Sequence, residues 1–240
     1  MDLSKVVPWG RSLNEYVEMF SLSNDDLCKK ILGCGDGPAS FNAELTARGG
    51  NVTSIDPIYS FNPDEIQLRM DEVYPQIMEQ VAKNMSDYVW DKINSTDQLG
   101  KIRMNAMNTF LLDYEQYQES ERYIDASLPQ LSFGALEFDL ALCSHYLFLY
   151  SEHVSQEQHV HSVKELCRIS KEVRIYPLLT ISSNKESPHL QPVMSSLIED
   201  GFDVSLQAVK YQFQKGATEM LVIKNNEKCI INSPSIFFSR

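Results

Sequence analysis

The stretch Lys30-Ile31-Leu32-Gly33-Cys34-Gly35-Asp36-Gly37-Pro38-Ala39-Ser40-Phe41 decides the fold of this chain. It begins as a short apolar strand, turns on three glycines at alternate positions, and continues into a helical pattern that stops at Gly49-Gly50. A glycine-rich turn between a strand and a helix lets the backbone approach a ligand closely and aims helix N–H groups at it. We therefore expect Gly35 to need a positive φ or the absence of a Cβ beside a ligand.

A second strand, residues 51–55, follows this helix and ends in Asp56, with Pro57 next to it. A carboxylate about 20 residues after the glycines suits the two hydroxyls of a ribose. The unit of strand, glycine turn, helix, strand and acid predicts one nucleoside-binding half of a doubly wound α/β sheet.

Residues 32–37, Leu-Gly-Cys-Gly-Asp-Gly, resemble the first motif of class I S-adenosylmethionine (SAM)-dependent methyltransferases, in which an acid and an apolar residue precede G-x-G-x-G. This chain departs from the motif at Ile31, where the acid would stand. The dinucleotide pattern G-x-G-x-x-G fits less well, because Pro38 replaces its third glycine and lacks the N–H that a pyrophosphate would bind. The resemblance implies SAM as the cofactor, held by Gly33, Cys34, Gly35, Gly37, Asp56 and Pro57.

A second stretch strengthens the resemblance. Asp125-Ala126, then Leu128-Pro129 and Phe138-Asp139, strongly resemble the matching stretch of the same class. In that family the acid hydrogen-bonds the adenine amino group and the next residue meets the ring, so the resemblance implies these roles for Asp125 and Ala126. From the residues alone, Asp125 is either an exposed acceptor at a strand end or a loop acid that caps a local turn.

The remaining pattern predicts a Rossmann-like α/β fold, a doubly wound seven-stranded sheet that is mostly parallel and ends in a C-terminal antiparallel hairpin. That hairpin distinguishes a methyltransferase sheet from a dinucleotide dehydrogenase. Further strands are predicted at residues 122–126, 138–143, 173–179, 203–209 and 219–224, with helices opening at Ser155 and covering residues 189–200.

Residues 1–29 are predicted to form a helical cover within a single domain of residues 1–240. Ser12 and Glu15 make a capping box, and apolar residues follow at helical spacing, with a second short helix from Ser23. These helices either cover one end of the sheet or close over the ligand, with Arg11 and Tyr16 near it.

Residues 57–122 are too long for a simple crossover and predict a helical insertion of two or three helices. Asn62 begins the first helix, Pro75 a further segment, and Ser95 another. The insertion is rich in methionine and aromatic residues, so it is either an adaptable static cap or a mobile, apolar lid on the acceptor site.

His145 is the titratable side chain expected at the mouth of the crevice. It directly follows Ser144, which ends the fourth strand and is a further candidate cofactor contact. His145 either acts as a general base or only packs beside the cofactor. Cys143 reads as an inert core thiol. The N/D-P-P-Y motif of methyltransferases that modify amino groups of nucleic acids and glutamine is absent here, and the histidine spacing predicts no metal site.

The charge and cysteine content of the chain limit the partners and the compartment that we expect. The 240-residue chain carries a net charge of −12, which disfavours a nucleic-acid or anionic-membrane surface. Met1–Pro8 lack an apolar signal region, and five cysteines without C-x-x-C predict reduced thiols in a cytoplasmic protein.

The whole chain resembles a little-characterised bacterial branch of the class. We expect methyl transfer to a small-molecule acceptor; a non-enzymatic SAM-binding or scaffold protein and, less favoured, an NAD-type oxidoreductase stay open, as does the oligomeric state.

Overall fold

A computed structural model describes residues 7–225. Its centre is a seven-stranded sheet with strand order β3-β2-β1-β4-β5-β7-β6. Neighbours run parallel from β3 to β5, whereas β7 is antiparallel to both β5 and β6, so the predicted fold is confirmed. The strands are β1 (Lys30–Cys34), β2 (Asn51–Ile55), β3 (Tyr123–Ile124), β4 (Phe138–Ser144), β5 (Ser170–Tyr176), β6 (Asp203–Ala208) and β7 (Glu219–Lys224).

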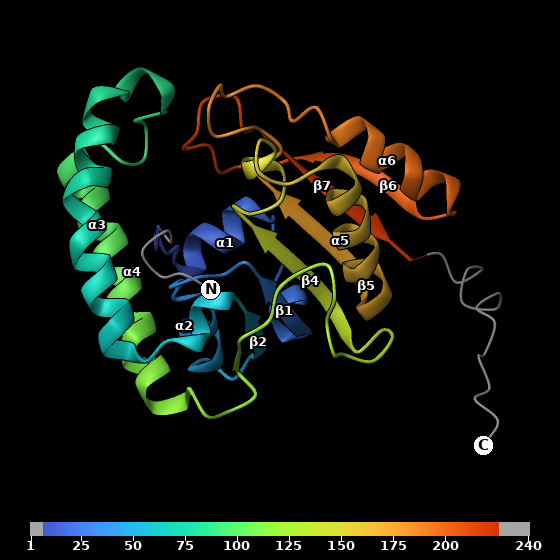
Figure 1. Cartoon of the computed structure of the whole chain (residues 1–240), viewed down its shortest axis with the longest axis horizontal. Helices are drawn as coiled ribbons and strands as arrows, with labels where there is room; N and C mark the ends of the chain where they lie inside the picture. Colours follow the sequence, from blue (N-terminus) through green and yellow to red (C-terminus); the bar gives the residue numbers. More distant parts are fainter. Residues whose placement is uncertain (1–6, 226–240) are drawn as a thin grey trace.

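Helices surround this sheet (Figure 1). The α-helices are α1 (Leu13–Met19), α2 (Phe41–Thr46), α3 (Pro63–Lys83), α4 (Thr96–Tyr117), α5 (Gln156–Ile169) and α6 (Leu190–Glu199), and the 3₁₀-helices are η2 (Asp26–Cys28), η3 (Pro57–Ser60), η4 (Met85–Asp87) and η5 (Phe148–Tyr150). No helix within residues 7–225 combines the length and the apolar character needed to cross a membrane.

The two faces of the sheet are covered by different helices because strand side chains alternate. In β4, Leu140 and Leu142 pack with α1 and α2, whereas Ala141 and Cys143 pack with α5 and α6. The strand order reverses between β1 and β4. After β1 the chain continues to β2 and β3 on one side of β1, and after β4 it continues to β5 on the other side. Open α/β sheets bind ligands at this point, outside the carboxyl ends of the strands.

Residues 57–122 form η3, α3, η4 and α4, and the two long helices stand side by side at the β3 edge (Figure 1). The expectation of a new segment at Pro75 is wrong, because α3 runs unbroken through that proline. Proline removes one backbone hydrogen bond. The buried stripe of Ile66, Met70, Val73 and Val81 continues on both sides of it, so packing holds the helix together.

The connection between α3 and α4 is pinned to the opposite side of the molecule. The Val89 N–H donates to the Phe213 carbonyl at 2.8 Å, and the Lys215 N–H donates to the Asp87 carbonyl at 2.9 Å. The Asn184 amide also donates to the Asp87 carbonyl, at 3.1 Å. The insertion is therefore an arch from the β3 edge to the loop between β6 and β7.

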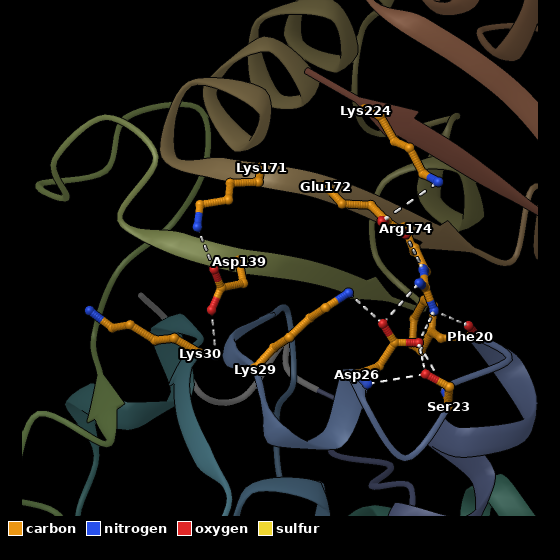
Figure 2. A network of polar contacts seen from close by, with 10 residues as sticks. All are labelled: Phe20, Ser23, Asp26, Lys29, Lys30, Asp139, Lys171, Glu172, Arg174 and Lys224. Atoms are coloured by element: carbon orange, nitrogen blue, oxygen red, sulfur yellow. Dashed lines mark hydrogen bonds and ion pairs between the residues drawn. The ribbon is translucent and has the colours of Figure 1, made fainter. Parts of the chain in front are cut away.

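A polar network fixes the N-terminal cover on the sheet (Figure 2). Asp26 accepts hydrogen bonds from Lys29 at 2.6 Å and from Arg174 at 3.3 Å, and Arg174 also donates to the Phe20 carbonyl at 2.8 Å. Burial alone would raise the pKa of Asp26, but the bonds from Lys29 and Ser23 and the Arg174 charge outweigh it and hold that pKa well below its usual value. The network locks the end of α1 onto β5.

Candidate functional site

A cavity of about 690 Å³ lies at the carboxyl ends of the parallel strands. Its walls are the glycine turn after β1, the end of β2, the segments after β3 and β4, the N-terminal residues 7–11, helix α3, and the loop between β6 and β7. The volume falls within the roughly 300–1,000 Å³ typical of small-molecule sites. The arch of the insertion closes it on one side, through Ile77, Gln80 and Val81 of α3.

The glycine turn has the backbone that its sequence predicts. Gly35 has φ +68° and Gly37 has φ +51°, a region that side chains with a Cβ rarely adopt. A Cβ on Gly35 would lie 2.8 Å from the Cβ of Tyr146. The positive φ is therefore confirmed at position 35, whereas the absent Cβ makes room for the Tyr146 side chain. The turn brings bare backbone to the cavity wall.

The N-terminal segment lies directly on this turn. A Cβ on Gly10 would lie 2.0 Å from the Pro38 carbonyl oxygen, and the Ser40 N–H donates to the Arg11 carbonyl at 3.0 Å. Arg11 thereby enters the cavity wall. Its Nη1 donates to the Trp9 carbonyl, while its buried Nε has no hydrogen-bond partner among the described residues. A guanidinium so placed is suited to an anionic ligand group.

Asp56 is held at the end of β2 by backbone donors. The Gly37 N–H and the Ile58 N–H each donate to one of its carboxylate oxygens at 2.9 Å. Burial, opposed by these two bonds and reinforced by the Asp125 charge, raises the pKa of Asp56 to about 6. A carboxylate oxygen can accept more than one hydrogen bond and Asp56 lines the cavity, so its carboxylate can still accept from a ligand.

Asp36, which sequence reasoning left out, lies at the centre of the polar site. It is 6% exposed and accepts from the Tyr16 hydroxyl at 2.7 Å and from the Ser54 hydroxyl at 2.6 Å. Burial, partly offset by these bonds and reinforced by the Asp56 charge, raises its pKa to about 7. The only available signal was its position between two glycines, since both partners lie on other elements.

His145 directly follows β4 and has φ +51°, a strained backbone for a histidine. Its N–H donates to the Tyr176 carbonyl at 2.8 Å, and its Nδ1 lies 2.9 Å from the Ser144 hydroxyl oxygen. Burial and the nearby Arg11 and Arg103 cations hold its pKa well below the ordinary value. A neutral imidazole thus forms part of the cavity wall.

The predicted residues divide into two groups. Those in the cavity wall are Arg11, Cys34, Gly35, Gly37, Asp56, Pro57, Ala126 and His145. Four others lie outside it. A Cβ on Gly33 would lie 1.8 Å from the Asp36 carboxylate, so this glycine makes room for a side chain and not for a ligand. Tyr16 and Ser144 are buried behind the wall, and the Asp125 side chain is exposed at the end of β3.

The far end of the cavity is apolar and aromatic. The Tyr88 and Phe213 rings stack with centroids 4.8 Å apart and planes inclined by 21°, and the Trp90 ring meets Phe213 edge-on at 5.5 Å. The backbone bonds of the arch hold the stacked pair in place. Ile77 and Val81 of α3 pack in the same cluster, and Leu149 and Ile181 are further apolar residues of the cavity wall.

Comparisons with known proteins give one near relative. No family model matches the sequence. The uncharacterized protein MJ0045 of Methanocaldococcus jannaschii is 33% identical over 226 residues, which cover 93% of this chain and 98% of the relative. That organism is an archaeon, so the bacterial branch expected from the sequence stays a prediction.

Solved structures with a similar fold are more distant. Magnesium protoporphyrin IX methyltransferase (ChlM) from Synechocystis PCC 6803 with bound SAM is 13% identical, with 89% of this chain and 78% of that chain covered and a TM-score of 0.46. A SAM-dependent methyltransferase from Aquifex aeolicus is also 13% identical, with 89% of both chains covered and a TM-score of 0.42. At such distances the function has to be inferred from the residues of the site.

Proposed function

Because this chain belongs to the same family as the uncharacterized protein MJ0045 of Methanocaldococcus jannaschii, whose name gives no activity, we propose its function from the site itself: SAM-dependent methyl transfer to a small, apolar acceptor. The observation that carries the proposal is that one cavity is bordered by the bare glycine turn, the Asp56 carboxylate and the Arg11 guanidinium, whose Nε has no hydrogen-bond partner among the described residues. SAM joins a nucleoside to an amino acid. The glycine turn would lie against its centre, Asp56 would bind its ribose, and Arg11 would bind its carboxylate.

The residues present fit SAM. The turn at Gly35 and Gly37 presents backbone to the cavity, Asp56 offers an acceptor to ribose hydroxyls, and Arg11 offers donors to the methionine carboxylate. Pro57 and Ala126 lie in the wall where the nucleoside would continue. Asp125, exposed beside them at the end of β3, remains our candidate for the adenine amino group.

When bound, SAM supplies a methyl group on a sulfonium, which passes to a nucleophilic atom of the acceptor and leaves S-adenosylhomocysteine (SAH). The chain contributes mainly position and orientation, which by themselves lower the barrier of such a displacement. The aromatic end at Tyr88 and Phe213 orients a flat apolar acceptor and excludes water. His145, neutral at neutral pH, accepts the acceptor's proton.

A thermal-shift panel tests the proposal first. A ligand that binds only the folded protein raises its apparent stability, by about 2.7 kcal/mol at a hundredfold excess over Kd. We expect stabilisation by SAM and SAH and none by NAD. Stabilisation by NAD alone would favour an oxidoreductase. Binding of SAM with no turnover on any acceptor would favour a non-enzymatic SAM-binding protein.

We propose a cytoplasmic location as well. Cys34, Cys143 and Cys167 are buried free thiols and Cys28 is an exposed one, while Cys229 lies outside the described residues. Free thiols are typical of reducing compartments.

Asp56→Asn should weaken SAM binding by about 1–3 kcal/mol, because a charge-assisted bond to the ribose is lost. The wild-type affinity should also depend on pH. Below the pKa of about 6 the carboxyl is protonated, so binding should weaken about tenfold between pH 7 and pH 5. Calorimetry at both pH values measures each effect.

Asp71→Asn is the matched control, since Asp71 is exposed on α3 and the change removes the same charge. If Asp56→Asn binds SAM as tightly as this control, or if the SAM affinity of the wild type does not depend on pH, Asp56 does not bind the ribose.

Arg11→Gln should weaken SAH binding about 10- to 100-fold, because a buried guanidinium–carboxylate pair is lost. The same variant should bind 5′-methylthioadenosine as the wild type does, since that nucleoside keeps the adenosine and lacks the carboxylate. Calorimetry with both ligands gives the comparison, with Arg48→Gln, exposed on the surface, as the control. An equal loss of affinity for SAH and for 5′-methylthioadenosine would show that Arg11 does not bind the carboxylate.

His145→Ala should lower turnover about 100-fold at saturating SAM and leave SAH affinity within about twofold of the wild type, because a general base contributes roughly this factor. An acceptor is found by screening flat apolar alcohols and phenols for SAH release. His161→Ala, an exposed histidine on α5, is the control. A large loss of SAH affinity with normal turnover would make His145 a cofactor contact instead.

A further inference from the structure

Two neutral amides lie where the arch of the insertion meets the loop between β6 and β7. Both Gln214 and Asn184 belong to the cavity wall, and the Gln214 Nε2 donates to the Asn184 Oδ1 at 2.8 Å. Gln214 also forms an isolated antiparallel β-bridge with Tyr88. The amide pair is therefore part of the aromatic end of the cavity, where the proposed methyl acceptor binds.

Two backbone carbonyls fix the orientation of both amides. A carbonyl oxygen only accepts hydrogen bonds, so the amide atom that faces it is the nitrogen. The Gln214 Nε2 donates to the Thr180 carbonyl at 3.1 Å, and the Asn184 Nδ2 donates to the Asp87 carbonyl at 3.1 Å. Turning either amide over would place oxygen against oxygen at the carbonyl, so the network has one consistent arrangement.

This arrangement leaves Gln214 only an acceptor for a ligand. Its two Nε2 hydrogens go to Thr180 and Asn184, and its backbone carbonyl accepts from the Ala217 N–H at 3.1 Å. Its side-chain Oε1 has no hydrogen-bond partner among the described residues. Because Gln214 lines the cavity, a ligand that forms a hydrogen bond with this side chain has to donate it.

The backbone on both sides of Gln214 is pinned to the arch. The Phe213 carbonyl accepts from the Val89 N–H at 2.8 Å, and the Lys215 N–H donates to the Asp87 carbonyl at 2.9 Å. Gln214 is therefore held in place before a ligand binds, and such preorganisation lowers the cost of binding.

We propose that Gln214 is a specificity-determining residue, whose Oε1 accepts a hydrogen bond from an O–H or N–H group of the methyl acceptor while Asn184 positions its amide. The inference rests on the proposed function, in which a flat apolar acceptor lies against Tyr88 and Phe213. It narrows the acceptor to molecules that carry a hydrogen-bond donor at that end. An ether or carbonyl oxygen there would face the Gln214 oxygen and leave both unpaired, which is costly.

Calorimetry of the SAH-loaded protein with indole and with benzofuran tests the proposal. The two probes are flat and nearly equal in shape, but indole donates through its N–H whereas the ring oxygen of benzofuran only accepts. Saturating SAH engages Asp56, which could otherwise accept from indole. Indole should bind the wild type about tenfold more tightly than benzofuran, because only indole can pair with the Gln214 Oε1.

A substitution of Gln214 assigns this preference to its amide. Gln214→Met keeps the length of the side chain and removes the amide, so the two probes should bind the variant with affinities within about twofold of each other. Gln76→Met makes the same change at an exposed position of α3, outside the cavity wall, and should keep the preference of the wild type.

Asn184→Gly tests the positioning separately. Glycine suits the φ of +53° at this residue, so the backbone is kept while the Gln214 amide loses one of its two anchors. The preference for indole should then fall to about threefold, because the amide is less firmly oriented. An Asn184→Gly protein with the full preference would overturn the positioning role of Asn184.

Equal binding of the two probes by the wild type, no binding of indole, or a preference that persists in Gln214→Met would overturn the role of Gln214. SAH affinity is measured on the same samples and should not change in these variants. Failure of the wild type to bind SAH would count against the proposed function, and the two probes are then compared on the unloaded protein. Loss of the preference with normal SAH binding would count against the role of Gln214 alone.

Discussion

Gly35→Val is expected to abolish SAM binding, with a Kd more than 100-fold above that of the wild type. The backbone at this position has φ +68°, and the new Cβ would lie 2.8 Å from the Cβ of Tyr146, closer than any ordinary contact. Because Tyr146 and the turn both belong to the cavity wall, a shift of either one changes the wall against which SAM is proposed to bind. Calorimetry with SAM and SAH measures the loss, and circular dichroism checks the fold.

Gly49→Val separates this steric effect from backbone strain. Gly49 has φ +87°, but a Cβ there would meet nothing within 4 Å. Both variants should lose about 1–2 kcal/mol of stability from the left-handed backbone, and only Gly35→Val should lose SAM. If Gly35→Val folds and binds SAM normally, the cofactor lies elsewhere.

Glu15→Gln is expected to cost about 3–5 kcal/mol of unfolding free energy, because it leaves the Arg103 cation buried without a counter-charge. Arg103 has no exposed surface and donates to both Glu15 oxygens, at 2.6 and 2.7 Å. The Tyr211 hydroxyl donates to the same carboxylate at 2.9 Å. This one carboxylate therefore joins α1, α4 and the loop before β7, and urea denaturation should register its loss as a lower transition midpoint.

Glu18→Gln on the same helix is the matched control, since its ion pair with Lys92 is exposed and should contribute less than about 1 kcal/mol. Replacing both Glu15 and Arg103 by methionine should recover much of the loss, because no charge then stays buried alone. A Glu15→Gln protein as stable as Glu18→Gln would contradict this account of the pair.

Stability should also fall on acidification. Burial alone would raise the pKa of Glu15, but the Arg103 and Arg11 cations outweigh burial and hold that pKa below its ordinary value. The carboxylate's contribution is therefore complete above its unfolded pKa of about 4.3 and is lost as the pH falls below it.

Local patterns predicted the parts of the fold that local physics decides. The capping box at Ser12, the glycine turn after β1 and the hairpin of β6 and β7 all form as their residue spacing indicates. Pro75 misled the prediction because a buried stripe on both sides of it outweighs one missing backbone bond.

The polar centre of the site was harder to predict, because its contacts join distant segments. The Asp36 bonds to Tyr16 and Ser54 cross from one turn to a helix and a neighbouring strand, and no spacing in the sequence encodes them. For Tyr16 the sequence left open whether its helix covers the sheet or closes over the ligand. In the structure Tyr16 lies buried behind the cavity wall and hydrogen-bonds Asp36.

The pinned arch has a consequence for synthesis of the protein on the ribosome. Its bond from Val89 to Phe213 joins residues 124 positions apart (213 − 89). Chains emerge at roughly 5–20 residues per second, so the aromatic end of the cavity stays unpaired for several seconds after α3 has been made. During that interval Ile77 and Val81 face water with no partner from the loop before β7. A nascent chain stalled before residue 213 should therefore recruit chaperones, and one stalled well after it should not.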